Sequence, residues 1–275
     1  FWEEITRDFD LRTARIDYGS GKITDNTGGI FYPVITLSPL SEKCLMIPDW
    51  TLDKVYLFSL ANGDLIDTNF IPAANPQLQS PKHALRHPNG KHIIVSDQIS
   101  DLVQRFDTSG PYLGFLAPSG GVNTSILDNM RGISFRPNNN LLVTVGSSAN
   151  QNTVQQFDSG GVLVGTFIGS NLNSPFDILI RATDILVSCS SGDDVVRFNL
   201  NGGFLSVFNT GTDISFAQQM YRTTGGRIAV SSFSIPNSGL TILDSNGTFL
   251  SRLTAITGNR GVYLLGNGHY LVTNG

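Results

Sequence analysis

The sequence predicts an all-β fold, a six-bladed β-propeller with four-stranded antiparallel blades. A degenerate unit recurs along nearly the whole chain, and its spacing of 41 to 51 residues is the length of one such blade. No window of about 12 residues has the 3.6-residue apolar period of a helix, so we expect almost no helix. The unit is marked by six glycines: Gly21, Gly63, Gly110, Gly161, Gly202 and Gly247.

The first two strands of each unit are apolar and are joined by a tight turn. Turns such as Pro88–Gly90 are rich in Pro, Asn and Gly, which supply the positive φ angles of a hairpin. The second strands are strongly β-branched or aliphatic, as expected for buried strands. They are predicted at 45–47, 93–95, 141–143, 185–187, 228–230 and 270–272.

The third strand carries the clearest repeat. The segment 103–107 (Val-Gln-Arg-Phe-Asp) returns in related form at 154–158, 195–199 and 240–244, with weaker copies at 55–59 and 14–17. A glycine-containing turn then leads to a fourth strand. Fourth strands are predicted near 112–115, 163–167, 204–208 and 249–253.

The two ends of the chain are predicted to share one blade. The C-terminus stops after a second strand, and the segment 13–24 reads as a third and a fourth strand. One blade built from 1–30 and 259–275 would close the ring and remove its open sheet edges. We therefore expect a single propeller domain over residues 1–275.

Composition excludes two classes of partner. A formal charge of −4 without clusters gives no basic stripe for nucleic acid. No apolar run approaches the ~18 residues of a transmembrane helix.

Several features favour a secreted or cell-surface protein. The chain begins at Phe1, which we interpret as leader removal or as part of a longer protein. Asn123 and Asn246 each begin an Asn-x-Ser/Thr sequon, so both are candidate glycosylation sites. Cys44 and Cys189 fall on opposed blades and are too far apart to form a disulfide. Because secreted chains usually pair their cysteines, two free thiols weaken the expectation of a secreted protein.

The unit 127–161 resembles the NHL repeat. It contains Arg131-Gly132-Ile133 in its first strand and Val-Gln-Gln-Phe-Asp in its third, and 94–97 (Ile-Val-Ser-Asp) matches the second strand of the repeat. The resemblance implies the propeller fold. It does not fix the function, because the family includes ligand-binding scaffolds, lyases and protein-interaction modules.

In a propeller, first strands start and second strands end on the same face, around the mouth of the channel. The loops 71–81 and 117–130 also rise on this face, and loops on a rigid scaffold are the usual seat of recognition. Aligning the repeats predicts a channel-mouth binding site. Its candidate residues are Asp49, Trp50, His83, Asp97, Arg131, Asp177, Gln218, Arg260 and Asn274.

Carboxylates at this mouth support a metal-dependent alternative. The arrangement is similar to that of gluconolactonase-type propellers, and this resemblance implies a divalent ion such as Ca²⁺ with oxygen ligands and His83 as general base. That family uses a Glu at a first-strand start, which this chain lacks. In the competing interpretation, Asp49 and Asp97 accept hydrogen bonds from loop amides. The candidate ligands are Asp49, Asp97, Asp177 and Asn274.

Three cations at the same mouth suggest an anion site. Lys82, Arg131 and Arg260 could receive a carboxylate, a sulfate or an anionic sugar, with Trp50 stacking on the sugar ring. The alternative is that each cation pairs with a nearby carboxylate such as that of Asp128 or Asp177.

These observations favour a non-catalytic, NHL-like scaffold that needs no cofactor. We expect it to bind a protein or glycan partner outside the cytoplasm, or to self-associate, through its loop-bearing face. The alternative is a lactonase- or lyase-like enzyme that holds Ca²⁺ in the central channel.

Overall fold

The computed structural model describes residues 15–17, 22–24, 30–31, 44–73 and 78–274. The chain divides into two compact units, Phe1–Ser41 and Glu42–Gly275. In the first unit, the described strands form one antiparallel sheet in the order β1-β2-β3. They are β1 (Arg15–Asp17), β2 (Lys22–Thr24) and β3 (Ile30–Phe31).

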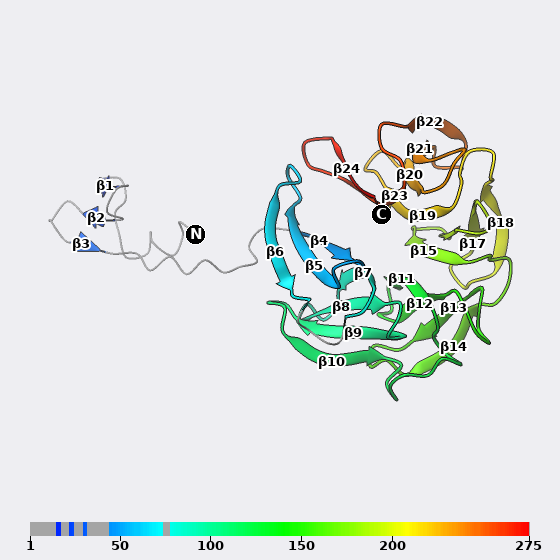
Figure 1. Cartoon of the computed structure of the whole chain (residues 1–275), viewed down its shortest axis with the longest axis horizontal. Coiled ribbons are helices and arrows are strands. Elements are labelled where there is room, and N and C mark those ends of the chain that lie inside the picture. Colours follow the sequence, from blue (N-terminus) through cyan, green and yellow to red (C-terminus); the bar gives the residue numbers. More distant parts are fainter. Residues whose placement is uncertain (1–14, 18–21, 25–29, 32–43, 74–77, 275) are drawn as a thin grey trace. The chain divides into compact units, whose positions relative to one another are not determined.

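The second unit is a β-propeller of antiparallel sheets arranged around a central axis (Figure 1). Its first described blade holds β4 (Cys44–Asp49), β5 (Lys54–Ser59) and β6 (Leu65–Ile71). The next holds β7 (Pro81–Arg86), β8 (His92–Asp97), β9 (Leu102–Asp107) and β10 (Tyr112–Ala117). The third holds β11 (Met130–Phe135), β12 (Leu141–Val145), β13 (Thr153–Phe157) and β14 (Leu163–Ile168).

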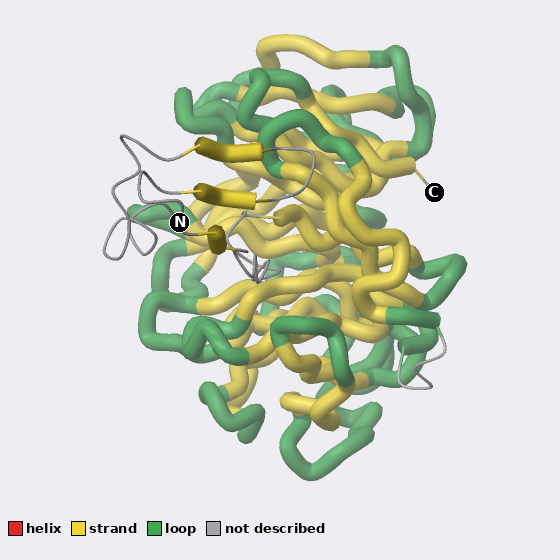
Figure 2. The backbone as a smooth tube through the Cα atoms, turned by 90° about the vertical axis from the view of Figure 1, so that its left-hand side faces the viewer, coloured by secondary structure: helices red, strands yellow, loops and turns green. Residues whose placement is uncertain are grey.

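Two further four-stranded blades follow. The fourth holds β15 (Pro175–Ile180), β16 (Ile185–Cys189), β17 (Asp194–Phe198) and β18 (Phe204–Asn209). The fifth holds β19 (Ala217–Arg222), β20 (Ile228–Ser232), β21 (Gly239–Leu243) and β22 (Phe249–Leu253). Every second strand lies where the sequence predicts it. The described residues contain strands and loops and no helix, hence none that could span a membrane (Figure 2).

A sixth, two-stranded sheet completes the circuit of the second unit. It holds β23 (Asn259–Leu264) and β24 (Tyr270–Asn274). Its turn contacts the first blade, where Gly266 N donates to Leu60 O at 2.9 Å and Asn267 N donates to Ala61 O at 3.0 Å. Five blades are thus built from described strands. The predicted sixth blade with two strands from each terminus stays a prediction.

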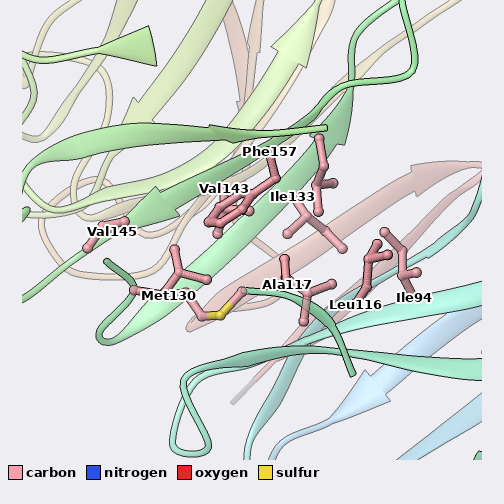
Figure 3. Packing of buried hydrophobic residues seen from close by; sticks show 11 residues of the cluster. Ile94, Leu116, Ala117, Met130, Ile133, Val143, Val145 and Phe157 are labelled. Carbon is pink, nitrogen blue, oxygen red and sulfur yellow. The ribbon is translucent and has the colours of Figure 1, made fainter. Parts of the chain in front are cut away.

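Apolar side chains fill the spaces between adjacent blades. One cluster joins Ile94 and Leu116 of the second blade to Met130, Ile133 and Phe157 of the third (Figure 3). The second strands of the four complete blades are buried almost end to end because each lies between two neighbouring blades. This is why they read as continuous apolar runs rather than as an alternating pattern.

The glycines that mark the repeat lie where one blade touches the next. The five that the structure describes all have positive φ, and at four of them a Cβ would lie within 1.7 to 2.2 Å of a carbonyl oxygen in the outer strand of the preceding blade. Only glycine permits both the backbone conformation and the close approach. The pairs are Gly110 with Phe70, Gly161 with Leu116, Gly202 with Phe167, and Gly247 with Phe208.

Candidate functional site

The starts of the first strands and the ends of the second strands meet on one face, as predicted. We call this the channel-mouth face. The strand register fixes it in five sheets, because the first residue of each first strand pairs with the last residue of the second. The pairs are Pro81 with Asp97, Met130 with Val145, Pro175 with Cys189, Ala217 with Ser232, and Asn259 with Asn274.

Hydroxyl groups on the second strands hold the starts of the first strands in place. The Ser96 hydroxyl accepts a hydrogen bond from His83 N at 3.0 Å and donates to Arg131 O, in the next blade, at 2.5 Å. Ser188 makes the equivalent pair of bonds to Asp177 N and Gln218 O. The first strands are therefore fixed both within and between blades.

Side chains at the first-strand starts also link neighbouring blades. The first strands have no strand on their channel side, so their N–H groups need other acceptors. Ile133 N donates to His83 Nδ1 at 3.4 Å, and Met220 N donates to Asp177 Oδ2 at 2.8 Å. His83 and Asp177 thus have structural roles in the ring.

The hydrogen bonds between blades change the alignment of one predicted residue, Gln218. Val262 N donates to Gln219 Oε1 at 3.1 Å, so Gln219, not Gln218, is the counterpart of His83 and Asp177. Gln218 instead aligns with Lys82 and Arg131, because each is the second residue of its first strand. Gln218 still belongs to the mouth, since its Oε1 accepts from Arg260 Nη1 at 3.3 Å.

His83 is poorly suited to act as a general base. Burial lowers the pKa of its imidazole, and the nearby Asp177 carboxylate, 3.8 Å from Nδ1, opposes that shift only in part. Nδ1 already accepts the Ile133 amide, so the neutral ring carries its proton on Nε2. The other nitrogen, Nε2, therefore has no free lone pair with which to accept a proton from a substrate.

Asp49 and Asp97 cap loops, as the competing interpretation expects. Asp49 Oδ1 accepts from Thr51 N and Leu52 N, both at 2.9 Å. Asp97 is fully buried and accepts four backbone amides. They are Gln79 N at 2.7 Å, Ser80 N at 3.1 Å, and Ile99 N and Ser100 N at 3.3 Å.

The candidate calcium ligands do not fit a metal site. No three His, Cys, Asp or Glu side chains of the described residues gather in a way that could hold a metal ion. The carboxylates of Asp49, Asp97 and Asp177 are all engaged by backbone amides. Asn274 is exposed at the end of β24, opposite Asn259. These four residues therefore do not form the ligand set that a calcium-dependent reaction would need.

The three predicted cations lie against aromatic rings. Lys82 Nζ is 4.4 Å from the Trp50 ring centroid, and Arg260 Cζ is 5.3 Å from the same ring. Arg260 also lies 4.2 Å from the ring of Phe233. Arg131 lies 5.7 Å from the ring of Phe176. Cation–π contacts of this kind attract without neutralising the charge.

The expected pairing of these cations with carboxylates is not found. No ion pair joins Lys82, Arg131 or Arg260 to a carboxylate in the part of the chain that the structure describes. Asp128 instead accepts the hydroxyl of Ser148 at 2.6 Å. Asp177 faces His83 and a backbone amide.

The three cations repel one another across the mouth. Burial, then the charges of Arg260 and Arg131, lower the pKa of Lys82 to about 8, and the carboxylates of Asp97 and Asp53 compensate only in part. Burial and Arg260 likewise lower the pKa of Arg131. Three positive charges therefore lie close enough to interact on the channel-mouth face of a chain that is acidic overall.

Sequence reasoning missed Phe233 as a mouth residue. It follows the second strand of the fifth blade directly, as Trp50 follows that of the first. An aromatic residue at the same repeat position in two blades is the signal that could have found it. The predicted sequon residues are both exposed, Asn123 in the loop before β11 and Asn246 in the turn before β22, and their glycosylation stays a prediction.

No protein-family model and no curated protein matches the chain. Its propeller is similar to a gluconolactonase from Xanthomonas campestris (TM-score 0.67, 13% identity, 86% of this chain and 80% of that one). It is also similar to a chain in a nidogen/laminin complex (TM-score 0.62, 17% identity, 77% and 75%). A virginiamycin B lyase from Staphylococcus aureus aligns with a TM-score of 0.56 at 10% identity, over 86% of each chain. These likenesses show the fold.

Proposed function

We propose that this protein is a non-catalytic, NHL-like propeller that binds a protein or glycan partner through its channel-mouth face, outside the cytoplasm. One observation carries the proposal. The carboxylates that an enzyme would need at the mouth are bonded to backbone amides, whereas Trp50 is 42% exposed and flanked by cations that form no ion pair with any carboxylate the structure describes. An exposed aromatic ring among cations is typical of a recognition surface.

A similar fold in a complex supports the binding role. One of the similar chains comes from a nidogen/laminin complex, an assembly of proteins. The gluconolactonase and lyase likenesses support the second candidate, an enzyme, only through the shared fold.

Replacing Trp50 with alanine tests the binding role. The wild-type chain is screened on a glycan array and against proteins from its native surroundings, and hits are measured by biolayer interferometry. Trp50→Ala should weaken binding by at least about tenfold, as expected for a central aromatic contact, without lowering the melting temperature. Phe204→Ala, an exposed aromatic on an outer strand, is the matched control. Equal binding by wild type and Trp50→Ala would contradict the proposal.

The enzyme alternative makes a separate prediction at Asp97. Asp97→Ala leaves four backbone amides, one in a buried and three in partly buried hydrogen bonds, without their acceptor and should cost about 2–4 kcal/mol of unfolding free energy. Because we assign Asp97 to loop capping, the loss should be the same in calcium as in chelator. Chemical denaturation under both conditions measures it. A loss confined to calcium would mark Asp97 as a metal ligand and favour the enzyme.

The self-association variant draws on a different surface. Every outer strand exposes large apolar side chains, so they recur from blade to blade around the rim. Sedimentation equilibrium over a range of concentrations tests this variant, and a chain that remains monomeric throughout would exclude it. The exposed residues include Leu65, Ile66, Leu113, Phe115, Leu163, Val164, Phe204, Leu205, Phe249 and Leu250.

A further inference from the structure

Three cations from three different sheets lie on the channel-mouth face, two of them against the ring of Trp50 and the third against that of Phe176. Lys82 comes from the second blade, Arg131 from the third and Arg260 from the last sheet. Because Lys82 and Arg260 both lie against Trp50, they are within ~10 Å of each other, about one Debye length at moderate salt. Their repulsion is therefore only partly screened.

The hydrogen-bond partners of Arg131 and Arg260 are neutral, and the carboxylates of Asp97 and Asp53 compensate the repulsion on Lys82 only in part. Arg131 Nη1 donates to the Ser174 hydroxyl at 2.8 Å, and Arg260 Nη1 donates to the Gln218 amide at 3.3 Å. Lys82 has its contact with Trp50 and no ion-pair partner among the described residues. A bound anion would relieve the part of this repulsion that Asp97 and Asp53 do not compensate.

Buried polar atoms beside Arg260 also lack partners. Arg260 Nε is buried and has no hydrogen-bond partner in the described part of the chain. The same holds for both side-chain polar atoms of Asn259, which is 1% exposed. Buried donors without acceptors cost about 1–3 kcal/mol each, so native structures normally supply a partner. An anionic ligand at Arg260 would supply acceptors.

We infer that the channel mouth binds an acidic saccharide, whose carboxylate or sulfate group contacts Lys82, Arg131 and Arg260 and whose ring packs on Trp50. This inference rests on the proposed binding function and names its ligand class. Arginine forks match the planar carboxylate or the sulfate oxygens, and the exposed indole matches the apolar C–H face of a sugar ring.

A saccharide fits these observations better than an acidic peptide or a polyanion. An acidic peptide would use the cations but has no flat C–H face for Trp50. A long polyanion requires a basic stripe, whereas the cations of the mouth are a cluster of three on a chain with a formal charge of −4.

Calorimetric titration of the intact chain tests the inference. The probes are a trigalacturonate, a sulfated disaccharide, neutral maltotriose and a poly-glutamate peptide. We expect at least one of the two acidic sugars to bind and maltotriose not to bind.

Lys82→Ala and Arg260→Gln should each weaken binding by at least about tenfold, the cost of one charge-assisted hydrogen bond. The matched controls, Lys91→Ala and Arg222→Ala, remove exposed cations at the other end of their blades and should bind as wild type.

The outcomes separate this inference from the broader proposal. Which acidic sugar binds distinguishes a carboxylate from a sulfate. If neither binds, or if Lys82→Ala and Arg260→Gln bind normally, the inference is overturned. Binding of the peptide alone, or of maltotriose as tightly as the acidic sugars, would overturn it too and still leave a partner-binding propeller. If the screen of the wild-type chain finds no protein or glycan partner at all, the proposed function is overturned instead.

Affinity for the acidic sugar should also fall at alkaline pH. Lys82 has a pKa of about 8 in the unbound protein, set by burial, by Arg260 and Arg131, and opposed by Asp97 and Asp53. Anion binding favours the charged ammonium, so affinity is greatest below about pH 8 and decreases above it. Lys82→Arg, which stays charged, should bind across this range without the decrease. An identical pH profile in Lys82→Arg and wild type would remove Lys82 from the site.

Discussion

Replacing Gly161 with alanine is expected to lower the unfolding free energy by about 3 kcal/mol or more. Losses of this size come from a short list of mechanisms. Two of them act together at this position. Gly161 has φ of +83°, where an L-residue costs about 1–3 kcal/mol. A Cβ would also lie 1.7 Å from Leu116 O and 2.6 Å from its carbonyl carbon, both backbone atoms of the preceding blade. Relief requires the two blades to move apart.

Gly226 provides the matched control. It has a similar φ of +80°, but a Cβ there would meet nothing within 4 Å. Gly226→Ala should therefore cost only the conformational term, about 1 kcal/mol. Urea denaturation of both variants measures the difference. Equal losses would show that the repeat glycine serves its turn alone and not the contact between blades.

The second large effect is expected at Asp184. Its carboxylate is fully buried and accepts from Arg181 Nε and Arg197 Nε, both at 2.5 Å. Arg181 also donates to Ser245 O in the next blade at 2.8 Å. Asp184→Ala would leave the largely buried Arg181 charge without a counter-ion, which typically costs about 3–5 kcal/mol.

The contribution of Asp184 should depend on pH. Burial raises the pKa of its carboxyl, but the hydrogen bonds from Arg181 and Arg197 outweigh burial and hold the pKa below its ordinary value. The stabilisation is thus present above the unfolded pKa of about 4 and is lost as pH falls through the lower folded pKa. Denaturation of wild type and Asp184→Ala at neutral and acid pH checks this, with the exposed Asp64→Ala as control. A neutral-pH loss no larger than that of Asp64→Ala would contradict the assignment.

Much of the fold could be predicted because inter-blade packing leaves simple traces in the sequence. A second strand lies between two blades, so 93–95 and 141–143 read as unbroken aliphatic runs. The glycine after each third strand recurs because a neighbouring carbonyl excludes a side chain there. The split sixth blade stays a prediction, since it depends on how two distant segments of the chain meet.

The mouth could be predicted only in outline. Repeat alignment placed Lys82, Arg131 and Arg260 on one face with Trp50, and the structure agrees. It misplaced Gln218 by one position, because Gln218 and Gln219 are identical neighbours and the sequence does not show which of them aligns with His83. Side-chain direction was the other gap. Nothing in the sequence indicates that Asp128 turns toward a serine hydroxyl instead of toward a cation.

Native mass spectrometry of the unmodified chain with added calcium and an acidic trisaccharide tests the central claim most directly. The account predicts one saccharide per chain, retained equally with and without calcium and lost in Arg260→Gln. A chain that retains one stoichiometric divalent ion, and binds no saccharide without it, would contradict the account. That result would instead favour a metal-dependent enzyme with its site at the channel mouth.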